Sequence, residues 1–424
     1  MEFKKYKLKN GLRVILAPTD NTATATVLFL VATGSKYENS QNNGISHFLE
    51  HLAFKGTKKR PTPKQITAEI DAIGGEVNAF TGEEYTGYWV RLDSQHLSLG
   101  LDFIADIVLH SLLPPKEVKK ERGVILEEIN MYEDQPMSKV EIDFTRVLYG
   151  DQPAGYPIAG SKEVIKKISR QQIVAYWQRQ YTAANSLLVV AGNLGGGKKV
   201  LAEANALFGR LKQGGHQSKL PVKNSQQKPA LKISFKETEQ THLLVGFKGG
   251  NLFNDQDKYP LSILASLMGG YMSARLFQEI REKRGWAYYV HGYIDFLTDS
   301  GVVGGQAGVL NSRAKESIGL ILREFRKIKE GRFSQKEVAM AKNNMIGRMA
   351  LSLENSQQIA GFLGKTALLE GKILTPQQIF DKIKAVKTAD LRRVAKKYFI
   401  NRGLNLALIG PHQNEESFKK ILKI

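Results

Sequence analysis

The residues best suited to chemistry in this sequence are two histidines and a glutamate in the segment HFLEH, residues 47–51. His47 and His51 stand four positions apart, so on a helix their imidazoles project from one face, one turn apart. Two imidazoles at that spacing can bind one metal ion, and Glu50 lies at the edge of the same face, within reach of a water beside the metal. This order is the inverted form of a zinc-binding helix. The alternative is a histidine-rich helix that is half exposed to solvent.

Such a site needs another protein ligand, because a catalytic zinc ion usually takes three and keeps one position for water. The chain has no cysteine, so the ligand must offer nitrogen or oxygen. The other histidines form no further pair four residues apart; they stand at positions 96, 110, 216, 242, 291 and 412. Carboxylates are therefore the better candidates.

The segment EVKKERGVILEEINMYE, residues 117–133, predicts a helix whose glutamates differ in environment. At 100° per residue its apolar stripe is formed by Val118, Ile125, Ile129 and Tyr132. Glu121 and Glu128 lie together along one edge of that stripe, whereas Glu127 lies nearly opposite and should face solvent. We therefore expect Glu128 to be the third ligand, and Glu121 to accept a hydrogen bond from a ligating histidine.

Length and composition are those of an ordinary folded protein. At 424 residues the chain is long enough for two to three domains. Hydrophobic content is 42% and charged content 24%, both usual for soluble proteins, and no apolar run approaches a membrane span. The N-terminal residues lack the apolar stretch and cleavage site of a signal peptide. We expect a cytoplasmic protein without membrane partners.

The net charge of +20 calls for an explanation. Nucleic-acid binding is one, but the basic residues are spread over separate segments, mostly beside predicted helices, and no finger, RRM or KH signature accompanies them. We interpret the charge as a solvated basic surface and expect no nucleic-acid partner. Attraction of acidic peptides is a secondary interpretation.

Alternating and periodic apolar residues predict an α+β fold. Asn10 and Gly11 favour a turn in an opening hairpin at 5–17, and Thr62 to Gln65 form a capping box for a helix that ends near Gly74. Further strands are predicted at 26–33, 76–80, 85–92, 186–192, 243–247 and 286–294. Further helices are predicted at 94–112, 117–133 and 258–268.

The second half of the chain repeats the first. The segment YWQRQYTAANSLLVVAGN is echoed by VAKKYFINRGLNLALIGP, which places Tyr181 and Tyr398 at equivalent positions, 398 − 181 = 217 residues apart. Residues 213–230 are polar and contain glycine and proline, which predicts a linker. We therefore expect two homologous modules, 1–212 and 231–424, each a mainly antiparallel sheet packed with helices. The segment that lies one such period after the metal helix is LSILASLMGG, which has neither histidine nor glutamate. We therefore expect the metal in the first module.

In several segments the sequence resembles the pitrilysin, insulin-degrading enzyme and mitochondrial processing peptidase family of zinc proteases, most of all its small bacterial members. The resemblance covers essentially the whole chain. It rests on HFLEHLAFKGT (47–57), GGEVNAFTGEEYT (74–86), ERGVILEEINMYEDQP (121–136), GYPIAGS (155–161) and LFQEIREKRGWAYYV (276–290). It implies that the two modules form half of a clamshell.

The resemblance also implies a role for each candidate residue of the first module. His47, His51 and Glu128 would bind one Zn²⁺ per chain. Glu128 is also the glutamate that the helix pattern favours. Glu50 would be the general base, and Glu121 would support a ligand.

The same resemblance implies substrate contacts. The segment VNAF matches an edge strand that binds an extended peptide by β-augmentation, through Asn78, Ala79 and Phe80. Arg281 and Tyr288 would hold the substrate and its scissile carbonyl from the opposite half. Their alternatives are a helix-surface arginine and a core tyrosine. Phe54 would lie beside the scissile bond, with a core role as its alternative.

The implied function is zinc-dependent hydrolysis of peptides inside a chamber formed by two facing subunits. Because the chain keeps both the metal residues and the Arg/Tyr pair, we expect a homodimer, or a heterodimer with a related subunit, in which the partner's second module completes each site. The alternative function is that of a non-catalytic scaffold or processing-complex subunit with the same fold. Such relatives normally lack parts of the metal pattern.

Overall fold

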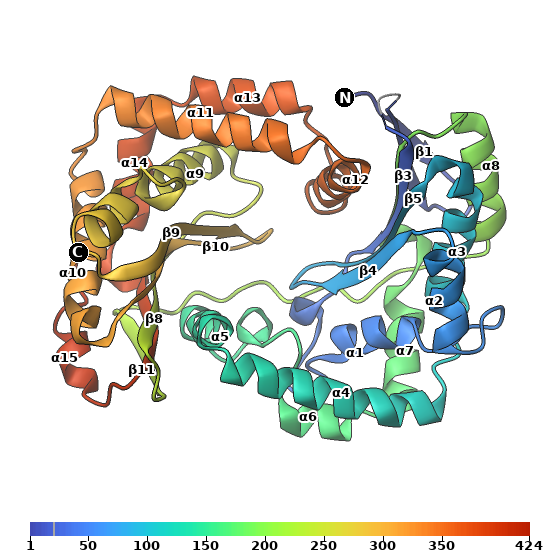
Figure 1. The fold of residues 1–424 in the computed structure, drawn as a ribbon, viewed down its shortest axis with the longest axis horizontal. Helices are drawn as coiled ribbons and strands as arrows, with labels where there is room; N and C mark the ends of the chain where they lie inside the picture. Colours follow the sequence, from blue (N-terminus) through green and yellow to red (C-terminus); the bar gives the residue numbers. More distant parts are fainter. Residues whose placement is uncertain (20–21) are drawn as a thin grey trace. The chain divides into compact units, whose positions relative to one another are not determined.

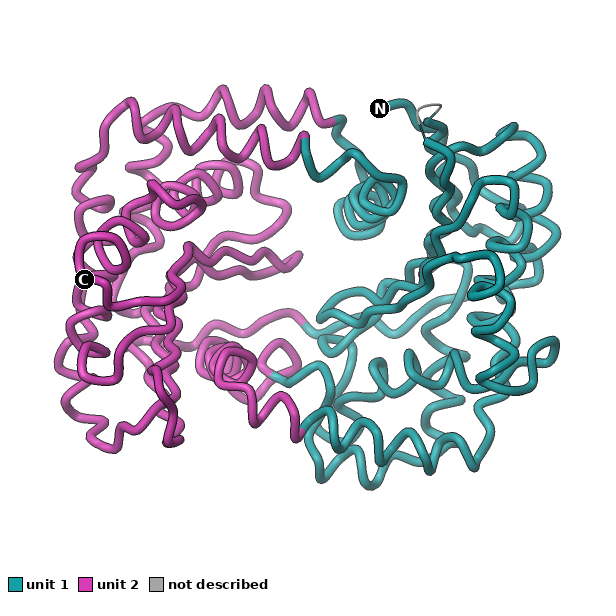
Figure 2. Tube along the Cα trace, in the orientation of Figure 1, with its two compact units in different colours: residues 1–129, 156–220, 351–375 teal, residues 130–155, 221–350, 376–424 magenta. Residues whose placement is uncertain are grey.

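The structure is a computed structural model that describes residues 1–19 and 22–424. The chain divides into two compact units (Figure 2). The first unit, in teal, contains residues 1–129, 156–220 and 351–375, and the second, in magenta, contains residues 130–155, 221–350 and 376–424. Within the described residues, no helix is both long and apolar enough to cross a membrane.

The first unit is built on a six-stranded sheet in the order β1-β2-β6-β3-β5-β4. Figure 1 labels β1, β3, β5 and β4 of this sheet. Its strands are β1 (Lys4–Lys7), β2 (Arg13–Pro18), β3 (Thr24–Val31), β4 (Glu76–Thr81), β5 (Thr86–Asp93) and β6 (Ser186–Gly192). Neighbours are antiparallel except β2 and β6, which are parallel. The apolar residues of β6 are buried along its whole length, so this strand lies at the centre of the core.

Helices pack on both faces of this sheet. The helices of this unit are α1 (Ile45–Ala53), α2 (Pro63–Asp71), α3 (Leu97–Leu109), α4 (Pro115–Asp134, which continues into the second unit), α6 (Lys162–Lys167), α7 (Arg170–Gln180), α8 (Gly197–Phe208) and α12 (Ser356–Lys365), of which α3 and α12 pack directly on the central strands. The predicted capping box begins α2. The Thr62 hydroxyl accepts a hydrogen bond from the backbone N–H of Gln65, and Oε1 of Gln65 accepts one from the backbone N–H of Thr62.

The second unit has a five-stranded sheet in the order β7-β11-β8-β10-β9. Its strands are β7 (Ala230–Phe235), β8 (Gln240–Lys248), β9 (Ala287–Phe296), β10 (Gly301–Leu310) and β11 (Leu404–Gly410). Its helices are α5 (Pro136–Tyr149), α9 (Asp255–Gly269), α10 (Ala314–Lys329), α11 (Gln335–Ser352, most of which lies in this unit), α13 (Pro376–Ala385), α14 (Thr388–Tyr398), α15 (Glu415–Lys419) and a π-helical segment, Phe277–Glu282.

The strand orders confirm the α+β fold and show the repeat. The order β2-β6-β3-β5-β4 of the first sheet matches β7-β11-β8-β10-β9 of the second, and the parallel pair, β2–β6 or β7–β11, occupies the same place. The echoed segments form the equivalent central strands β6 and β11. The residues between Leu211 and Ala230 form neither helix nor strand, as a linker composition predicts.

One helix of each half packs on the sheet of the other half. Helix α5 covers the second sheet with Val140, Phe144 and Leu148, which pack against apolar residues of β8 and β11. Helix α12 covers the first sheet in the same way with Ile359, Ala360 and Leu363. The compact units are therefore interleaved along the chain, while the module boundaries 1–212 and 231–424 stay a prediction about the repeat.

Candidate metal centre

Helix α1 begins where the chain turns sharply and is capped by a buried carboxylate. Gly44 has a φ of 93°, which favours glycine, and a Cβ there would lie 2.7 Å from the carbonyl oxygen of Ala159. The Glu38 carboxylate accepts the backbone N–H groups of Gly44 at 2.7 Å and Ser46 at 2.9 Å. Its oxygens satisfy backbone donors that would otherwise be unpaired at the start of the helix. These contacts fix where α1 starts.

Three metal-ligating side chains meet between α1 and α4. The Oε2 atom of Glu128 lies 3.6 Å from Nε2 of His47 and 3.4 Å from Nε2 of His51. Their donor atoms all lie within 4.8 Å of one another, and within the described residues no other group of three such side chains does so. Glu127 is exposed, as the helix pattern predicts. The structure thus brings together the three residues that the sequence predicts.

The donor set fits a zinc ion. Zinc held by bonds of 2.0–2.1 Å in a tetrahedron separates its nitrogen and oxygen donors by roughly 3.3 Å, close to the distances from Glu128 to the two imidazoles. Burial lowers the pKa of His47 to about 4, which keeps this imidazole neutral and able to bind a metal. Burial alone would also lower the pKa of His51, but Glu121 and Glu128 outweigh it and raise the pKa to about 9. Binding of a cation there would release the His51 proton.

Glu121 supports the site from the buried side of α4. Its Oε2 lies 3.3 Å from Nδ1 of His51, and its Oε1 lies 2.9 Å from Nζ of Lys55. Burial alone would raise the pKa of Glu121, but His51 and Lys55 outweigh it and lower the pKa. An ionised Glu121 accepts the Nδ1 proton and leaves Nε2 of His51 directed toward Glu128.

Glu50 lies beside the ligands and contacts the sheet. Its Oε2 accepts a hydrogen bond from Oγ1 of Thr81 at 2.5 Å. Burial raises the pKa of Glu50, while Thr81 and His51 act in the opposite direction. A carboxylate with a raised pKa is a stronger proton acceptor, which suits a general base.

Strand β4, which contains Asn78, Ala79 and Phe80, forms the edge of the first sheet. Gly82 donates to the carbonyl of Tyr85 at 2.9 Å, so alternation along an antiparallel pair turns the backbone groups of Ala79 away from β5. In agreement, the Ala79 N–H bonds to Oδ1 of Asn78 at 2.8 Å. The backbone edge at Ala79 is therefore available to an added strand.

Phe80 and Phe54 are the two predicted aromatic substrate contacts; Phe80 lies in β4 and Phe54 directly follows α1. Phe80 is 37% exposed and its ring packs edge-on against Tyr85, with centroids 5.6 Å apart. It folds over Gly87, where a Cβ would lie 2.3 Å from the ring. Phe54 follows the last turn of α1, is half-buried, and lies 6.4 Å from the ring of Tyr88.

Arg281 and Tyr288 lie together in the second unit. Tyr288 is at the start of edge strand β9 and is 75% exposed, so it is not a core residue. The Arg281 Cζ lies 5.9 Å from the centroid of the Tyr288 ring and 4.8 Å from that of Phe277. Both side chains are thus held as a pair by contacts within their own unit.

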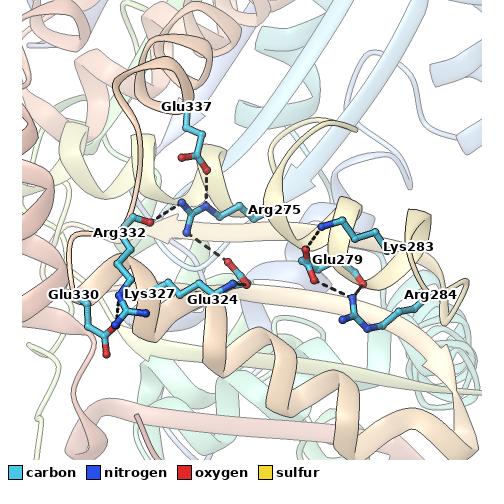
Figure 3. A network of polar contacts seen from close by, with 9 residues as sticks. All are labelled: Arg275, Glu279, Lys283, Arg284, Glu324, Lys327, Glu330, Arg332 and Glu337. Carbon is cyan, nitrogen blue, oxygen red and sulfur yellow. Dashed lines mark hydrogen bonds and ion pairs between the residues drawn. The ribbon is translucent and has the colours of Figure 1, made fainter.

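Ion pairs hold the segment that carries this pair (Figure 3). Glu279 accepts from Lys283 at 2.5 Å and from Arg284 at 2.9 Å. One helical turn earlier, Arg275 contacts Glu337 at 2.7 Å and the buried Glu324 at 3.5 Å. The Arg275 pairs tie the segment before Arg281 to α10 and α11, and the Glu279 pairs link residues on either side of Arg281.

Sequence reasoning missed Glu38, Lys55 and Thr81. The turn GSKYENSQNNG gives no sign that Glu38 folds back onto the helix start, because its loop conformation is set by tertiary contacts. Lys55 lies four residues after His51, a spacing that could have suggested a shared partner. Thr81 stands two residues after Ala79 in β4, so the alternation of the strand could have placed both side chains on one face.

The chain is similar to known proteins along nearly its whole length. Residues 13–162 match the family described as Insulinase (Peptidase family M16), and residues 167–345 match the Peptidase M16 inactive domain. The chain is 34% identical to the uncharacterized zinc protease YmxG of Bacillus subtilis, over 98% of this chain and all of that protein. It is 36% identical to an uncharacterized zinc protease of Rickettsia felis, over 97% of this chain and 98% of that protein.

Solved structures share the fold over nearly the whole chain. A protease from Helicobacter pylori superposes with a TM-score of 0.90 at 25% identity, covering 97% of this chain and 99% of that one. A chain of complex III from Candida albicans gives a TM-score of 0.85 at 18% identity, covering 99% of this chain and 100% of that one. Because relatives above 30% identity match nearly the whole chain, and the family model matches residues 13–162, the chain belongs to peptidase family M16.

Proposed function

We propose that this protein is a zinc-dependent endopeptidase that hydrolyses extended peptides or unfolded segments. One observation carries the proposal: Glu50 lies on the same helix as His47 and His51, beside the point where both imidazoles meet Glu128. A metal bound by three side chains with an adjacent carboxylate is the arrangement used for metal-assisted hydrolysis. The names of the full-length relatives support a protease.

The residues of this chain divide the chemistry among them. His47, His51 and Glu128 would hold the zinc ion, which when bound lowers the pKa of a water molecule and polarises a carbonyl group. Glu50 takes a proton from the attacking water and delivers it to the leaving amine. Tyr288, with Arg281, would donate hydrogen bonds to the oxygen that becomes negative as the peptide bond is attacked.

Strand β4 supplies the substrate site in this proposal. An extended peptide would add to the free edge of the sheet, pairing with outward-facing backbone groups such as those of Ala79. Recognition through the backbone accepts many sequences, which fits a peptidase for unfolded segments. The Asn78 side chain, which now bonds to the Ala79 amide, would give way to a substrate carbonyl.

We further propose that two copies of this chain, or this chain and a related subunit, face each other around a chamber. The support is the resemblance of both halves to a family that assembles in this way, together with the retention of metal residues and the Arg/Tyr pair in one chain. Size-exclusion chromatography with light scattering should show a dimer of twice 47.3 kDa. A monomer with full peptidase activity would contradict the proposed two-subunit chamber.

A non-catalytic scaffold or processing-complex subunit is the second candidate, favoured by the match of residues 167–345 to a domain described as inactive. One experiment separates the two. The purified protein is analysed for metal and incubated with a mixed peptide library, before and after removal of the metal with a chelator and its replacement by zinc. A peptidase gives new peptides by mass spectrometry only with zinc present, whereas zinc-loaded protein that leaves every peptide intact indicates a scaffold.

A further inference from the structure

We infer that Thr81 is a positioning residue for the carboxylate of Glu50, so that the strand expected to bind the substrate also sets the orientation of the general base. The inference deepens the proposed peptidase function and rests on it. Its basis is the hydrogen bond of 2.5 Å from Oγ1 of Thr81 to Oε2 of Glu50.

This bond is suited to holding a carboxylate in one orientation. A hydroxyl that donates to an ionised carboxylate forms a short, charge-assisted bond, stronger than one between neutral groups. It occupies Oε2 and leaves Oε1 of Glu50 to accept the proton of the attacking water. Without it, the Glu50 side chain could rotate about three bonds, and proton transfer requires donor and acceptor within hydrogen-bond reach.

Thr81 can direct Glu50 because its own strand is firmly held. Thr81 pairs with Thr86 across the β4–β5 hairpin, and the buried Thr86 hydroxyl donates to the carbonyl of Thr33 at 3.0 Å. At the turn, the Gly82 carbonyl accepts from the Ser35 amide at 3.3 Å. These bonds tie the end of β4 to the segment that follows β3.

A buried ion pair reinforces the same contact. Lys36 and Glu84 are 1% and 2% exposed and lie 2.9 Å apart, and Lys219 also contacts Glu84. Gly34 allows the close approach, because a Cβ there would lie 2.1 Å from the carbonyl oxygen of Gly82. The hairpin that presents Thr81 is therefore clamped between loop 34–36 and residue 219.

The alternation of β4 connects Thr81 to the substrate as well as to Glu50. Gly82 forms a hydrogen-bonded pair with Tyr85, so Thr81 and Ala79 turn their backbone groups toward the free edge. Their side chains point to the opposite face from that of Phe80, and the side chain of Thr81 reaches Glu50. One rigid strand thus sets both the register of the peptide and the position of the base.

The test compares two substitutions at this position. Thr81→Val keeps the shape and the β-branch but removes the hydroxyl, whereas Thr81→Ser keeps it. We expect the valine variant to lose roughly ten- to hundredfold in kcat, because misplacement of a reacting group is that costly, with KM and zinc content close to wild type. The serine variant should recover most of that loss. Thr67→Val, which removes a hydroxyl bonded within helix α2, should leave kcat unchanged.

A structural readout separates this inference from the proposed function. Crystal structures of the zinc-loaded valine and serine variants should show the Glu50 carboxylate displaced in the first and retained in the second. An unmoved Glu50 in the valine variant, or equal kcat in wild type and valine variant, would overturn the inference. A wild-type protein that cleaves no peptide would contradict the proposed function, and the crystal structures would still decide whether Thr81 positions Glu50.

Discussion

The Nδ1 atom of His51 lies 3.3 Å from Oε2 of Glu121, while Nε2 of the same ring lies 3.4 Å from Oε2 of Glu128. One imidazole therefore spans two carboxylates from the same helix, seven residues apart. Because the Glu121 carboxylate accepts the Nδ1 proton, Nε2 keeps its lone pair and directs it toward Glu128, where a metal would bind. Lys55 holds Glu121 in this position.

Glu121→Gln should weaken zinc binding without destroying the fold. The amide is uncharged and is a poorer acceptor for the Nδ1 proton, so His51 becomes a less basic and less well oriented ligand. Loss of such a partner typically costs 10–100-fold in metal affinity. A competition titration with a chromophoric chelator measures the change. Equal zinc affinity in the variant and the wild type would show that Glu121 does not act through His51.

Glu128→Gln should remove most of the bound zinc, because the amide offers a neutral oxygen where the site needs a carboxylate. Glu127→Gln, one residue earlier on the exposed side of α4, is the matched control and should keep it. Elemental analysis of both purified variants gives the zinc content per chain. The reverse outcome, with zinc lost only from the Glu127 variant, would mean that the ligand assignment is wrong.

Glu84→Gln should lower stability by about 3–5 kcal/mol, because it removes the carboxylate charge that lies 2.9 Å from the buried Lys36 ammonium. The surface pair of Glu76 and Arg91, 2.7 Å apart, provides a control, and Glu76→Gln should cost less than about 1 kcal/mol. Urea unfolding followed by circular dichroism measures both. Similar losses in the two variants would show that the buried pair does not hold the hairpin.

The loss of folding stability caused by Glu84→Gln should also depend on pH. Burial alone would raise the pKa of Glu84, but Lys36 and Lys219 outweigh it and hold the pKa below its usual value. A carboxyl whose pKa is lower in the folded state than in the unfolded state stabilises the fold at pH values above the unfolded pKa of about 4.3. That stabilisation is lost as the pH falls through the pKa of the folded state. The stability difference between wild type and Glu84→Gln should therefore be constant near neutral pH and shrink below about pH 4.

Mixing two inactive variants tests whether a partner's Tyr288 completes each site. If Glu50 of one subunit works with Tyr288 of the other, a mixed dimer of Glu50→Gln and Tyr288→Phe chains contains one site in which both residues are intact. Co-refolded or co-expressed variants should then regain up to about a quarter of the wild-type activity per chain, since half of the dimers are mixed and half of their sites are complete. No recovery from demonstrably mixed dimers would place both residues of a site in one chain.

Much of the metal centre follows from the sequence because it depends on helix periodicity. The spacing of His47 and His51 fixes their common face, and the apolar stripe of α4 decides between Glu127 and Glu128 without knowledge of the fold. The repeat follows from the echoed strands β6 and β11. These features are local, so propensity and pattern determine them.

Features that depend on contacts between distant segments were not predicted. The amphipathic patterns of α5 and α12 show that each must cover apolar surface, but not that each covers the sheet of the other half. Thr81 meets Glu50, and Glu38 meets the start of α1, through loops whose conformation the pattern leaves open. Local periodicity contains no information about which surface an amphipathic helix or a loop carboxylate will find.

Comparison of wild type with Glu50→Gln tests the central claim most directly. Both proteins are assayed for zinc content and for cleavage of the same peptide mixture. Because Glu50 is the proposed base and not a ligand, we expect about one zinc per chain in both, with cleavage by the wild type and at least a thousandfold less by the variant, in line with the loss of an essential base. A Glu50→Gln protein that keeps its zinc and cleaves peptides at the wild-type rate would contradict the account.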